Sequence, residues 1–327
     1  MSQKKNDRVA ILYLSYDGLM EPLGQSQVFQ YLRELASTGS YDITVLSYEK
    51  KADWQNVARR RAVKEQVRAA GLRWVPLRYH KRPTAPATAY DTFLGILVGS
   101  FLCWTRGIRI VHARSYVASV VALALKWAFG TRFVFDMRGF WADERVDAGI
   151  WRPRSALYRA TKWFEQHFLE HADVVVSLSR AGIEEMRKFP YLRDRQPAFE
   201  FIPTCANLEM FQVPARPTVA NATLTIGYVG TAIGWYVFEP TAVAFKRILE
   251  FQPATRFLIL NRDEHDYIRA ELRRQGIPEA AVEIKAVEHR DVPREMARMD
   301  ATVFFIKPVF SKKASAPTKL GELLGCG

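Results

Sequence analysis

The sequence predicts an α/β protein of two tandem, doubly wound, Rossmann-like domains, each built on a parallel sheet. Short apolar segments of strand length alternate with longer helical segments along the whole chain. One stretch rich in Pro, Asn and Thr, FQVPARPTVANATLT, interrupts this alternation. The length of 327 residues leaves room for two domains with separate cores. We therefore expect a first domain over residues 1–208, a linker over 209–223 and a second domain over 224–327.

In the first half, the strand-like segment VAILYLSYD opens the alternation, and a helical pattern over residues 25–37 follows it. Further strands are predicted near residues 41–49, 72–80, 109–116, 132–140, 173–179 and 199–203. Helical patterns near residues 53–70, 90–106, 118–130 and 155–172 separate most of them. Such units form right-handed crossovers between parallel strands, and ligands of these sheets bind beyond the carboxyl ends of the strands.

After residue 223 the same alternation restarts. Strands are predicted in LTIGYVGTA, TRFLILNRD, VEIKAV and ATVFFIKP, with a short apolar strand over Val303 to Ile306. Helices are predicted over residues 240–252 and 264–275, with a short helix before the last strand and a final helix that follows Pro317. The second half therefore repeats the architecture of the first.

The net charge is uneven along the chain. Residues 1–208 carry 31 Lys and Arg against 20 Asp and Glu, a net charge of +11, whereas residues 209–327 carry only +2. This excess indicates an anionic partner: nucleic acid, a phospholipid surface or a phosphorylated substrate. A solvated basic face is the alternative. We expect the run Arg59, Arg60, Arg61 and Lys64 to hold the protein peripherally on an anionic membrane surface.

No secretion signal or membrane-spanning segment is predicted. The N-terminus has only a short apolar run without a small-residue cleavage site. The apolar stretch Phe93 to Trp104 is too short to cross a bilayer, so a buried amphipathic helix is favoured, with an interfacial helix as the alternative. Three distant cysteines form neither a disulfide framework nor a metal-binding pattern. We expect a cytoplasmic protein that binds peripherally to the inner face of the plasma membrane if its basic patch meets lipid.

Several common chemistries lack their motifs. The first strand-to-helix turn, YDGLMEPLGQSQ, has no G-x-G-x-x-G spacing, and the chain has no P-loop, H-E-x-x-H or G-x-S-x-G motif. The acidic groups DERVD and RDEHD are more simply explained as solvated carboxylates than as a metal site. No metal site is therefore predicted.

The segment FFIKPVFSKKASAPTKLGELLGCG combines lysines, hydroxyl groups and a proline just before a helix. A helix N-terminus favours phosphate through its free N–H groups and its dipole. Ser315 and Thr318 offer donors there, lysines supply charge, and Glu322 lies one turn further along, where a carboxylate accepts from sugar hydroxyls. A nucleotide's diphosphate and ribose fit this pattern, although ordinary surface decoration explains it equally well.

The same segment, PVFSKKASAPTKLGELLGCG, resembles the donor-binding segment of family-4 glycosyltransferases of the GT-B fold. In that family a loop of the second domain leads into a helix whose Glu holds the nucleotide ribose. GYVGTAIGWY resembles the first strand and turn of the donor domain, and EHRDVPREMARMDATVFFIKP the stretch before its last strand. HADVVVSLSRAG resembles the segment before the interdomain region, and FDMRGFWADE a variant of polysaccharide-assembly members. The resemblance covers most of the chain.

The resemblance implies an acceptor-side first domain and a second domain that binds a nucleotide-sugar. The expected catalytic residues are Asp136 and Arg138, where the family usually carries a histidine. The acceptor side is expected near Gly24, His112 and Trp141, although a lone histidine such as His112 is more often structural. The residues expected to bind the donor are Gly230, Thr231, Lys307, Ser315, Thr318, Lys319 and Glu322.

Two features depart from the family pattern. The family usually has two glutamates separated by seven residues, and if Glu322 is the second, Ala314 stands at the first. The usual Arg and Lys pair after the first donor-domain strand is not evident in GTAIGWYVFE. Lys307 or Lys319 is therefore expected to supply the charge that holds the phosphates.

The function that follows is transfer of a sugar from a nucleotide-diphosphate sugar to a hydroxyl acceptor, a lipid-linked or surface glycan, with retained anomeric configuration. The helix dipole and basic side chains would stabilise the leaving diphosphate, so neither a metal nor a further cofactor is expected. Two alternatives stay open: a GT-B-like nucleotide-sugar epimerase, and a basic nucleic-acid-binding module, against which the arginines do not interleave with aromatics. The family's donor domain continues past GCG, so the resemblance implies an incomplete second domain in a C-terminally truncated chain, whose activity stays open.

Overall fold

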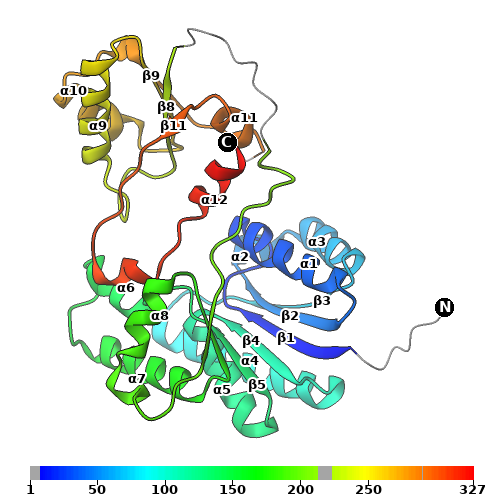
Figure 1. Cartoon of the computed structure of the whole chain (residues 1–327). Helices are drawn as coiled ribbons and strands as arrows, with labels where there is room; N and C mark the ends of the chain where they lie inside the picture. The colour runs from blue at the N-terminus through cyan, green and yellow to red at the C-terminus, as the bar shows by residue number, and fades with distance from the viewer. Residues whose placement is uncertain (1–7, 213–222, 289) are drawn as a thin grey trace. The chain divides into compact units, whose positions relative to one another are not determined.

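A computed structural model describes residues 8–212, 223–288 and 290–327 (Figure 1). The chain forms two compact units. Unit 1 comprises residues 1–203 and 313–315, and unit 2 comprises residues 204–312 and 316–327. Most of the predicted linker, residues 213–222, lies outside the described residues.

Unit 1 is built on a seven-stranded parallel sheet in the order β3-β2-β1-β4-β5-β6-β7. The order reverses at β1, which pairs with both β2 and β4, so the topological switch point lies there. The strands are β1 (Val9–Ser15), β2 (Tyr41–Glu49), β3 (Arg73–Arg78), β4 (Ile110–Arg114), β5 (Arg132–Asp136), β6 (Val174–Ser177) and β7 (Ala198–Phe201).

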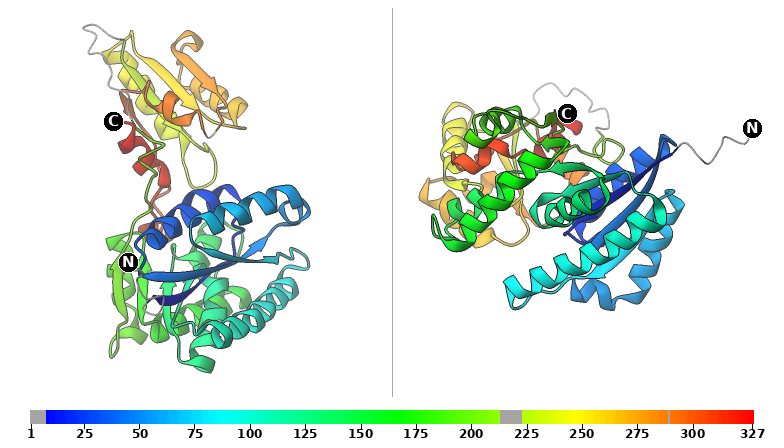
Figure 2. Two further views of the ribbon diagram at one scale, coloured as in Figure 1. Left: turned by 90° about the vertical axis from the view of Figure 1, so that its right-hand side faces the viewer. Right: turned by 90° about the horizontal axis from the view of Figure 1, so that it is seen from below.

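The helices of unit 1 cover both faces of this sheet (Figures 1 and 2). A π-helix, Gly24–Phe29, continues directly into α1 (Gln30–Ser37). The other helices are α2 (Lys51–Gln55), α3 (Val57–Ala69), α4 (Thr84–Arg106), α5 (Ser115–Phe129), α6 (Trp141–Asp147), α7 (Ala156–His171) and α8 (Arg180–Arg187), with a 3-10 turn at Pro190–Leu192. A further 3-10 turn, Phe310–Ala314, has residues 310–312 in unit 2 and residues 313–314 in unit 1.

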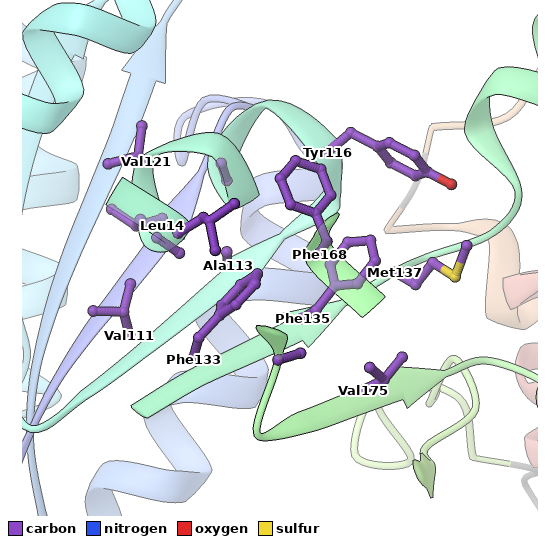
Figure 3. Close-up of a cluster of buried hydrophobic side chains, with 14 of the residues drawn as sticks. Leu14, Val111, Ala113, Tyr116, Val121, Phe133, Phe135, Met137, Phe168 and Val175 are labelled. Carbon is purple, nitrogen blue, oxygen red and sulfur yellow. The ribbon is translucent and has the colours of Figure 1, made fainter. Parts of the chain in front are cut away.

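Alternation along the strands divides the core of unit 1 into two clusters. Leu12 and Leu14 of β1 pack in the cluster that contains α5 and α7, whereas Tyr13 packs in the cluster that contains α1 and α3. Figure 3 shows the first cluster, where Phe135 of β5 meets Phe168 of α7 with ring centroids 5.3 Å apart. Residues of one parity in each strand therefore face α1, and those of the other parity face α5.

Unit 2 contains a smaller parallel sheet of four strands in the order β10-β9-β8-β11. The strands are β8 (Thr225–Val229), β9 (Arg256–Leu260), β10 (Val282–Lys285) and β11 (Ala301–Thr302). The helices are α9 (Phe238–Phe251), α10 (His265–Arg274), α11 (Val292–Met296) and α12 (Thr318–Gly325), with a 3-10 turn at Glu279–Ala281. Buried Phe245 and Phe257 stack at 4.1 Å in its core.

The two-domain α/β fold is confirmed, but some details of the prediction are wrong. The apolar strand expected over residues 303–306 does not form, because the chain leaves β8 after Thr302 and Ile306 makes an isolated antiparallel bridge with Tyr236. Helix α6 was not predicted. The helix expected around Phe93 is present as α4, yet Phe93 itself is 59% exposed, so that helix is buried on one side only.

Candidate functional site

A polar cluster lies near the carboxyl ends of the central strands of unit 1. Parallel register places Tyr13 of β1 beside His112 of β4, and Arg114 of β4 beside Asp136 of β5. All four have the parity that faces the π-helix and α1, because their neighbours Val111, Ala113 and Phe135 occupy the opposite cluster. The strand ends next to a topological switch point are where doubly wound sheets bind ligands.

Asp136 lies at the centre of this cluster and is only 6% exposed. Its Oδ2 atom lies 3.8 Å from Nε2 of His112 and 3.9 Å from Nη1 of Arg114. Burial alone would raise the pKa of Asp136, but His112, Arg138 and Arg114 outweigh that effect and hold the pKa below its ordinary value. Asp136 is therefore an ionised carboxylate at neutral pH.

Gln27 of the π-helix connects the two arginines of the cluster. Its Oε1 atom accepts hydrogen bonds from Nη2 of Arg114 at 2.8 Å and from Nη2 of Arg138 at 3.0 Å. Arg138 adopts a left-handed backbone conformation with φ of 60°, which is uncommon for a residue with a side chain. Strained residues of this kind concentrate at functional sites.

The cluster contains buried polar atoms whose hydrogen-bonding capacity is not used. Within the described part of the chain, Nε2 of His112, Nε of Arg114 and Oδ1 of Asp136 have no hydrogen-bond partner. Buried polar atoms without partners are rare, and several in one place indicate a site that binds polar ligand groups or water. Arg114 and Gln27 were not predicted from the sequence.

Gly24, expected on the acceptor side, begins the π-helix and is buried. A Cβ atom at this position would lie 2.1 Å from the carbonyl oxygen of Gly18, so only glycine fits. The loop between them is held by the buried Glu49, which accepts from the N–H groups of Leu19 at 2.8 Å and Met20 at 3.1 Å. Gly24 thus allows the close packing that places Gln27, three residues later, against Arg114 and Arg138.

Trp141, also expected on the acceptor side, is half-buried and packs against the hydrophobic core of unit 1. Its ring centroid lies 5.6 Å from that of Tyr116 and 5.2 Å from that of Trp151, and Arg145 lies over its face. Among the described residues, the ring contacts of Trp141 are with these aromatic and basic neighbours and not with the Asp136 cluster.

Unit 2 brings together Lys319 and Gly230, which were both expected to bind the donor. Lys319, in the first turn of α12, is 9% exposed, and its Nζ atom donates to the carbonyl of Val229 at 2.5 Å. The same ammonium lies 3.5 Å from the ring centroid of Tyr236. Gly230 has φ of 103°, and a Cβ atom there would lie 2.8 Å from Nζ of Lys319. The carboxyl end of β8 and the start of α12 therefore meet at a buried ammonium.

This ammonium is poorly neutralised. Burial lowers the pKa of Lys319 to about 8, and the charge of Glu322 opposes that shift only in part. Burial, followed by the charge of Glu322, also raises the pKa of Tyr236. Glu322 therefore acts electrostatically on the same group, one turn further along α12.

The turn after β8 is fixed by two side chains from the segment between β9 and α10. Nδ2 of Asn261 donates to the carbonyl of Gly230 at 3.0 Å and to Oε2 of Glu264 at 2.7 Å. The same Glu264 oxygen accepts from the N–H group of Ala232 at 2.7 Å. This arrangement holds the backbone of residues 230–232 in one conformation beside Lys319.

The remaining donor-side candidates are less closely associated with Lys319. Thr231 is exposed, and its carbonyl accepts from the hydroxyl of Tyr228 at 2.6 Å. Thr318 begins α12 and is half-buried, whereas the side chain of Lys307 is exposed. Ser315 belongs to unit 1, where its hydroxyl donates to Oε1 of Glu144 at 3.5 Å.

Ala314 occupies the position where the family pattern usually has its first glutamate. It is 1% exposed and packs in the hydrophobic core of unit 1. Among the described residues, no group of three or more His, Cys, Asp or Glu gathers in a way that could hold a metal ion.

Structure comparison shows that this fold has many relatives. HepE of Anabaena, solved in complex with UDP and glucose, superposes with a TM-score of 0.60 at 13% identity, covering 98% of this chain and 79% of that protein. Sucrose-phosphate synthase of Thermosynechococcus elongatus gives 0.59 at 14% identity, with 90% and 75% covered. A putative UDP-N-acetylglucosamine 2-epimerase of Listeria monocytogenes gives 0.54 at 10%, with 90% and 73% covered.

Sequence comparison identifies the family. No curated protein matches the chain significantly. The family model of the glycosyl transferase 4-like domain, however, matches residues 24–197. This range contains the π-helix and most of the Asp136 cluster, and the two parallel sheets are those of the GT-B fold. The chain belongs to the glycosyl transferase 4-like domain family.

Proposed function

We propose that the protein transfers a sugar from a nucleotide-diphosphate sugar to a hydroxyl group of a lipid-linked or surface glycan, with retention of anomeric configuration and without a metal ion. Sugar transfer in general follows from membership of the family. The nucleotide-sugar donor is supported by the likeness to HepE, whose structure contains UDP and glucose. Retention, metal independence and the class of acceptor go beyond this support and are the proposal.

The observation that carries the donor assignment is the buried ammonium of Lys319. An ammonium in a buried site is costly unless an anion accompanies it. Here a carbonyl oxygen and an aromatic face surround it, beside a glycine turn that leaves no side chain in the way. A diphosphate would supply the missing negative charge through charge-assisted hydrogen bonds. The same ammonium would then stabilise the diphosphate as it leaves the sugar.

Glu322 suits the ribose of the same nucleotide. A carboxylate accepts hydrogen bonds from two adjacent hydroxyl groups, and Glu322 lies one helical turn beyond Lys319. This role accords with the glutamate that the family resemblance implies at this position.

The Asp136 cluster of unit 1 suits the acceptor. Asp136 is ionised, and its Oδ1 atom has no hydrogen-bond partner among the described residues, so it can accept a hydrogen bond from an acceptor hydroxyl. Arg114 and Arg138 keep that carboxylate charged, and Gln27 holds both guanidinium groups in place. We assign Asp136 to orienting and polarising the hydroxyl that attacks the sugar.

The test is a product assay with the full chain. Labelled nucleotide sugars are incubated with a glycolipid extract, and the labelled glycolipid and the released nucleoside diphosphate are quantified in parallel. We expect equal amounts of both products and full activity in EDTA. We also expect the new glycosidic bond to have the same anomeric configuration as the sugar in the donor. Asp136→Asn should abolish transfer while nucleoside diphosphate affinity stays unchanged. An inverted linkage would refute retention, and loss in EDTA would refute metal independence.

A nucleotide-sugar epimerase is the second candidate, because the fold also resembles a putative UDP-N-acetylglucosamine 2-epimerase. Conversion of the donor to its epimer without any acceptor would support that function and would contradict glycosyl transfer. The same assay, run without the glycolipid extract, separates the two.

A further inference from the structure

Helix α4 carries a continuous exposed apolar stripe on the face that points away from the core. Its five members follow one another at intervals of three or four residues, so they lie on one face of the helix. They are Tyr90 (55% exposed), Phe93 (59%), Leu97 (52%), Phe101 (60%) and Trp104 (79%). Exposed apolar patches of this extent mark a surface that contacts a protein or a membrane.

The opposite side of α4 is fully used by the fold. Gly95 lies so close to Tyr48 of β2 that a Cβ atom would be 2.1 Å from its hydroxyl oxygen, and at Gly99 a Cβ atom would be 2.8 Å from Leu125 of α5. The glycines therefore serve the inward packing of the helix. On the outer side, Tyr90 meets the ring of His80 at 5.2 Å, and the rest of the stripe has no such packing role among the described residues. Figure 2 shows α4 (cyan, right view) along the outer margin of this unit.

Within the described part of the chain, α4 is the single helix long and apolar enough to cross a membrane. It is nevertheless fastened to the sheet. Asp91 is completely buried and accepts from the hydroxyl of Tyr16 at 3.0 Å and from the backbone N–H of His80 at 3.0 Å. Spanning a bilayer would break these contacts and place the carboxylate of Asp91 in lipid, which is costly, so we expect the helix to stay on the sheet. It can present its outer face to a bilayer surface.

Helix α5 extends the apolar surface. Gly95 approaches Val121 and Gly99 approaches Leu125, so the two helices run in the same direction with a constant offset. This offset places the end of α5 beside the end of α4. Phe129 of α5, one turn after Leu125, is 43% exposed, whereas Trp127 (62% exposed) lies toward α7, with its ring 5.8 Å from that of His171. The C-terminal ends of both helices therefore carry exposed aromatic side chains, and tryptophan favours the membrane–water interface.

Basic residues flank the stripe at both ends of α4. Lys81 and Arg82 are exposed before its first turn, and Arg106 and Arg109 are exposed at and after its last turn. None of these four side chains forms an ion pair with any described residue. The one acidic residue in α4 is the buried Asp91. The outer face therefore offers apolar groups and positive charge without negative charge, which is complementary to an anionic lipid surface.

The basic run of α3, by contrast, is partly engaged within the protein. Arg59 pairs with Asp53 at 2.9 Å and donates to the carbonyl of Met20 at 2.6 Å. Arg60 lies over the ring of Trp54 at 4.7 Å. No apolar stripe accompanies this run, since its helix exposes mainly charged side chains. It is the weaker membrane-binding candidate.

We propose that the outer face of α4, together with the end of α5, docks on the surface of an anionic phospholipid bilayer, with the helix axis along the membrane plane. Tyr90, Phe93, Leu97, Phe101 and Trp104 enter the headgroup region, and the arginines at the ends contact lipid phosphates. This contact belongs to unit 1 alone and does not depend on which sugar is transferred. It would bring the enzyme to a lipid-borne acceptor.

The test is flotation of the full chain with vesicles of phosphatidylcholine, with and without phosphatidylglycerol. We expect partitioning that requires phosphatidylglycerol and falls with added salt. The double variant Leu97→Ser/Phe101→Ser should lose at least about ten-fold in partitioning, because each side chain forfeits its burial in lipid. Arg106→Glu/Arg109→Glu should lose about five-fold or more per residue. Thermal unfolding of both variants should match that of the unmodified chain, since all four residues are exposed.

Two control variants sharpen the result. Phe251→Ser/Leu324→Ser removes two apolar side chains of unit 2 that are 88% and 74% exposed, and Arg61→Glu/Lys64→Glu changes the α3 run. Both should bind vesicles as the unmodified chain does. Equal losses in the controls, or unchanged binding in the α4 variants, would overturn the proposal. A third outcome would also overturn it: the unmodified chain does not bind vesicles and is a dimer in light scattering, and Leu97→Ser/Phe101→Ser converts this dimer to a monomer. The stripe would then join two copies of the chain.

Discussion

The protonation of Lys319 gives the sharpest prediction about nucleotide binding. In the free protein, burial lowers the pKa of this ammonium to about 8. A bound diphosphate would favour the charged form, so the pKa should rise on binding. Binding is then strongest where Lys319 is already protonated, below pH 8, and it weakens as the pH rises through that value. The complex should therefore take up a proton at pH 8 to 9.

The size of the effect follows from the pKa. At pH 9, one unit above the pKa of about 8, about one-tenth of the free protein carries the proton. Affinity for a nucleoside diphosphate should consequently be about ten-fold lower than at neutral pH, equivalent to roughly 1.4 kcal/mol. Titration calorimetry in two buffers of different ionisation enthalpy measures both the affinity and the proton uptake.

Lys319→Arg is the matched control, because a guanidinium keeps its charge over this whole range. This variant should bind with little proton uptake, and any titration of the ligand itself would appear in both proteins. An affinity that does not change between pH 7 and 9 in the unmodified chain would refute the reasoning. So would an identical pH profile in Lys319→Arg.

Further substitutions test the rest of the two sites. Glu322→Ala should weaken nucleoside diphosphate binding by about 1–3 kcal/mol in calorimetry, with Glu322→Gln milder, and an unchanged affinity would exclude a ribose contact. Removing Lys307 should reduce diphosphate affinity more than nucleoside affinity if its charge meets the phosphates, and equal losses would exclude that role. Gly230→Ala should displace Lys319 and lower nucleotide affinity. It should also lower the free energy of unfolding by about 1–3 kcal/mol in urea titration, because φ is 103° at this position, and an unchanged stability would contradict this. Gly24→Ala should destabilise unit 1 by about 1–3 kcal/mol because its Cβ meets a backbone carbonyl, and a neutral effect would show that the loop can move aside.

Much of the fold could be predicted from the alternation of apolar and helical segments. Parallel strands buried on both faces leave long apolar runs, such as those of β1 and β5, which are visible in the sequence. The last strand was predicted wrongly because VFFI has strand composition, while its backbone is used in the contact with Tyr236 instead. The exposure of the α4 stripe could not be predicted either, because the apolar sequence of a helix does not show how much of its surface the core covers.

The candidate site was partly accessible from sequence. Asp136 and Arg138 were selected because the family resemblance implies a histidine in their loop, and His112 was selected by its place at a strand end. The structure brings Asp136 and His112 within 3.8 Å. Arg114 was missed, although it follows His112 by two residues in the same strand and therefore faces the same side of the sheet, which could have been predicted from the sequence. Gln27 could not be found in this way, because its approach to both arginines depends on the π-helix and on the packing of Gly24.

The assignment of Lys319 to the donor is the central claim, and a crystal structure of the chain with a bound nucleoside diphosphate tests it most directly. The account predicts the diphosphate within hydrogen-bond distance of Nζ of Lys319, beside Gly230, with the ribose hydroxyl groups on the carboxylate of Glu322. A diphosphate held instead by Arg114 and Arg138 of unit 1, with the ammonium of Lys319 still on the carbonyl of Val229, would contradict it.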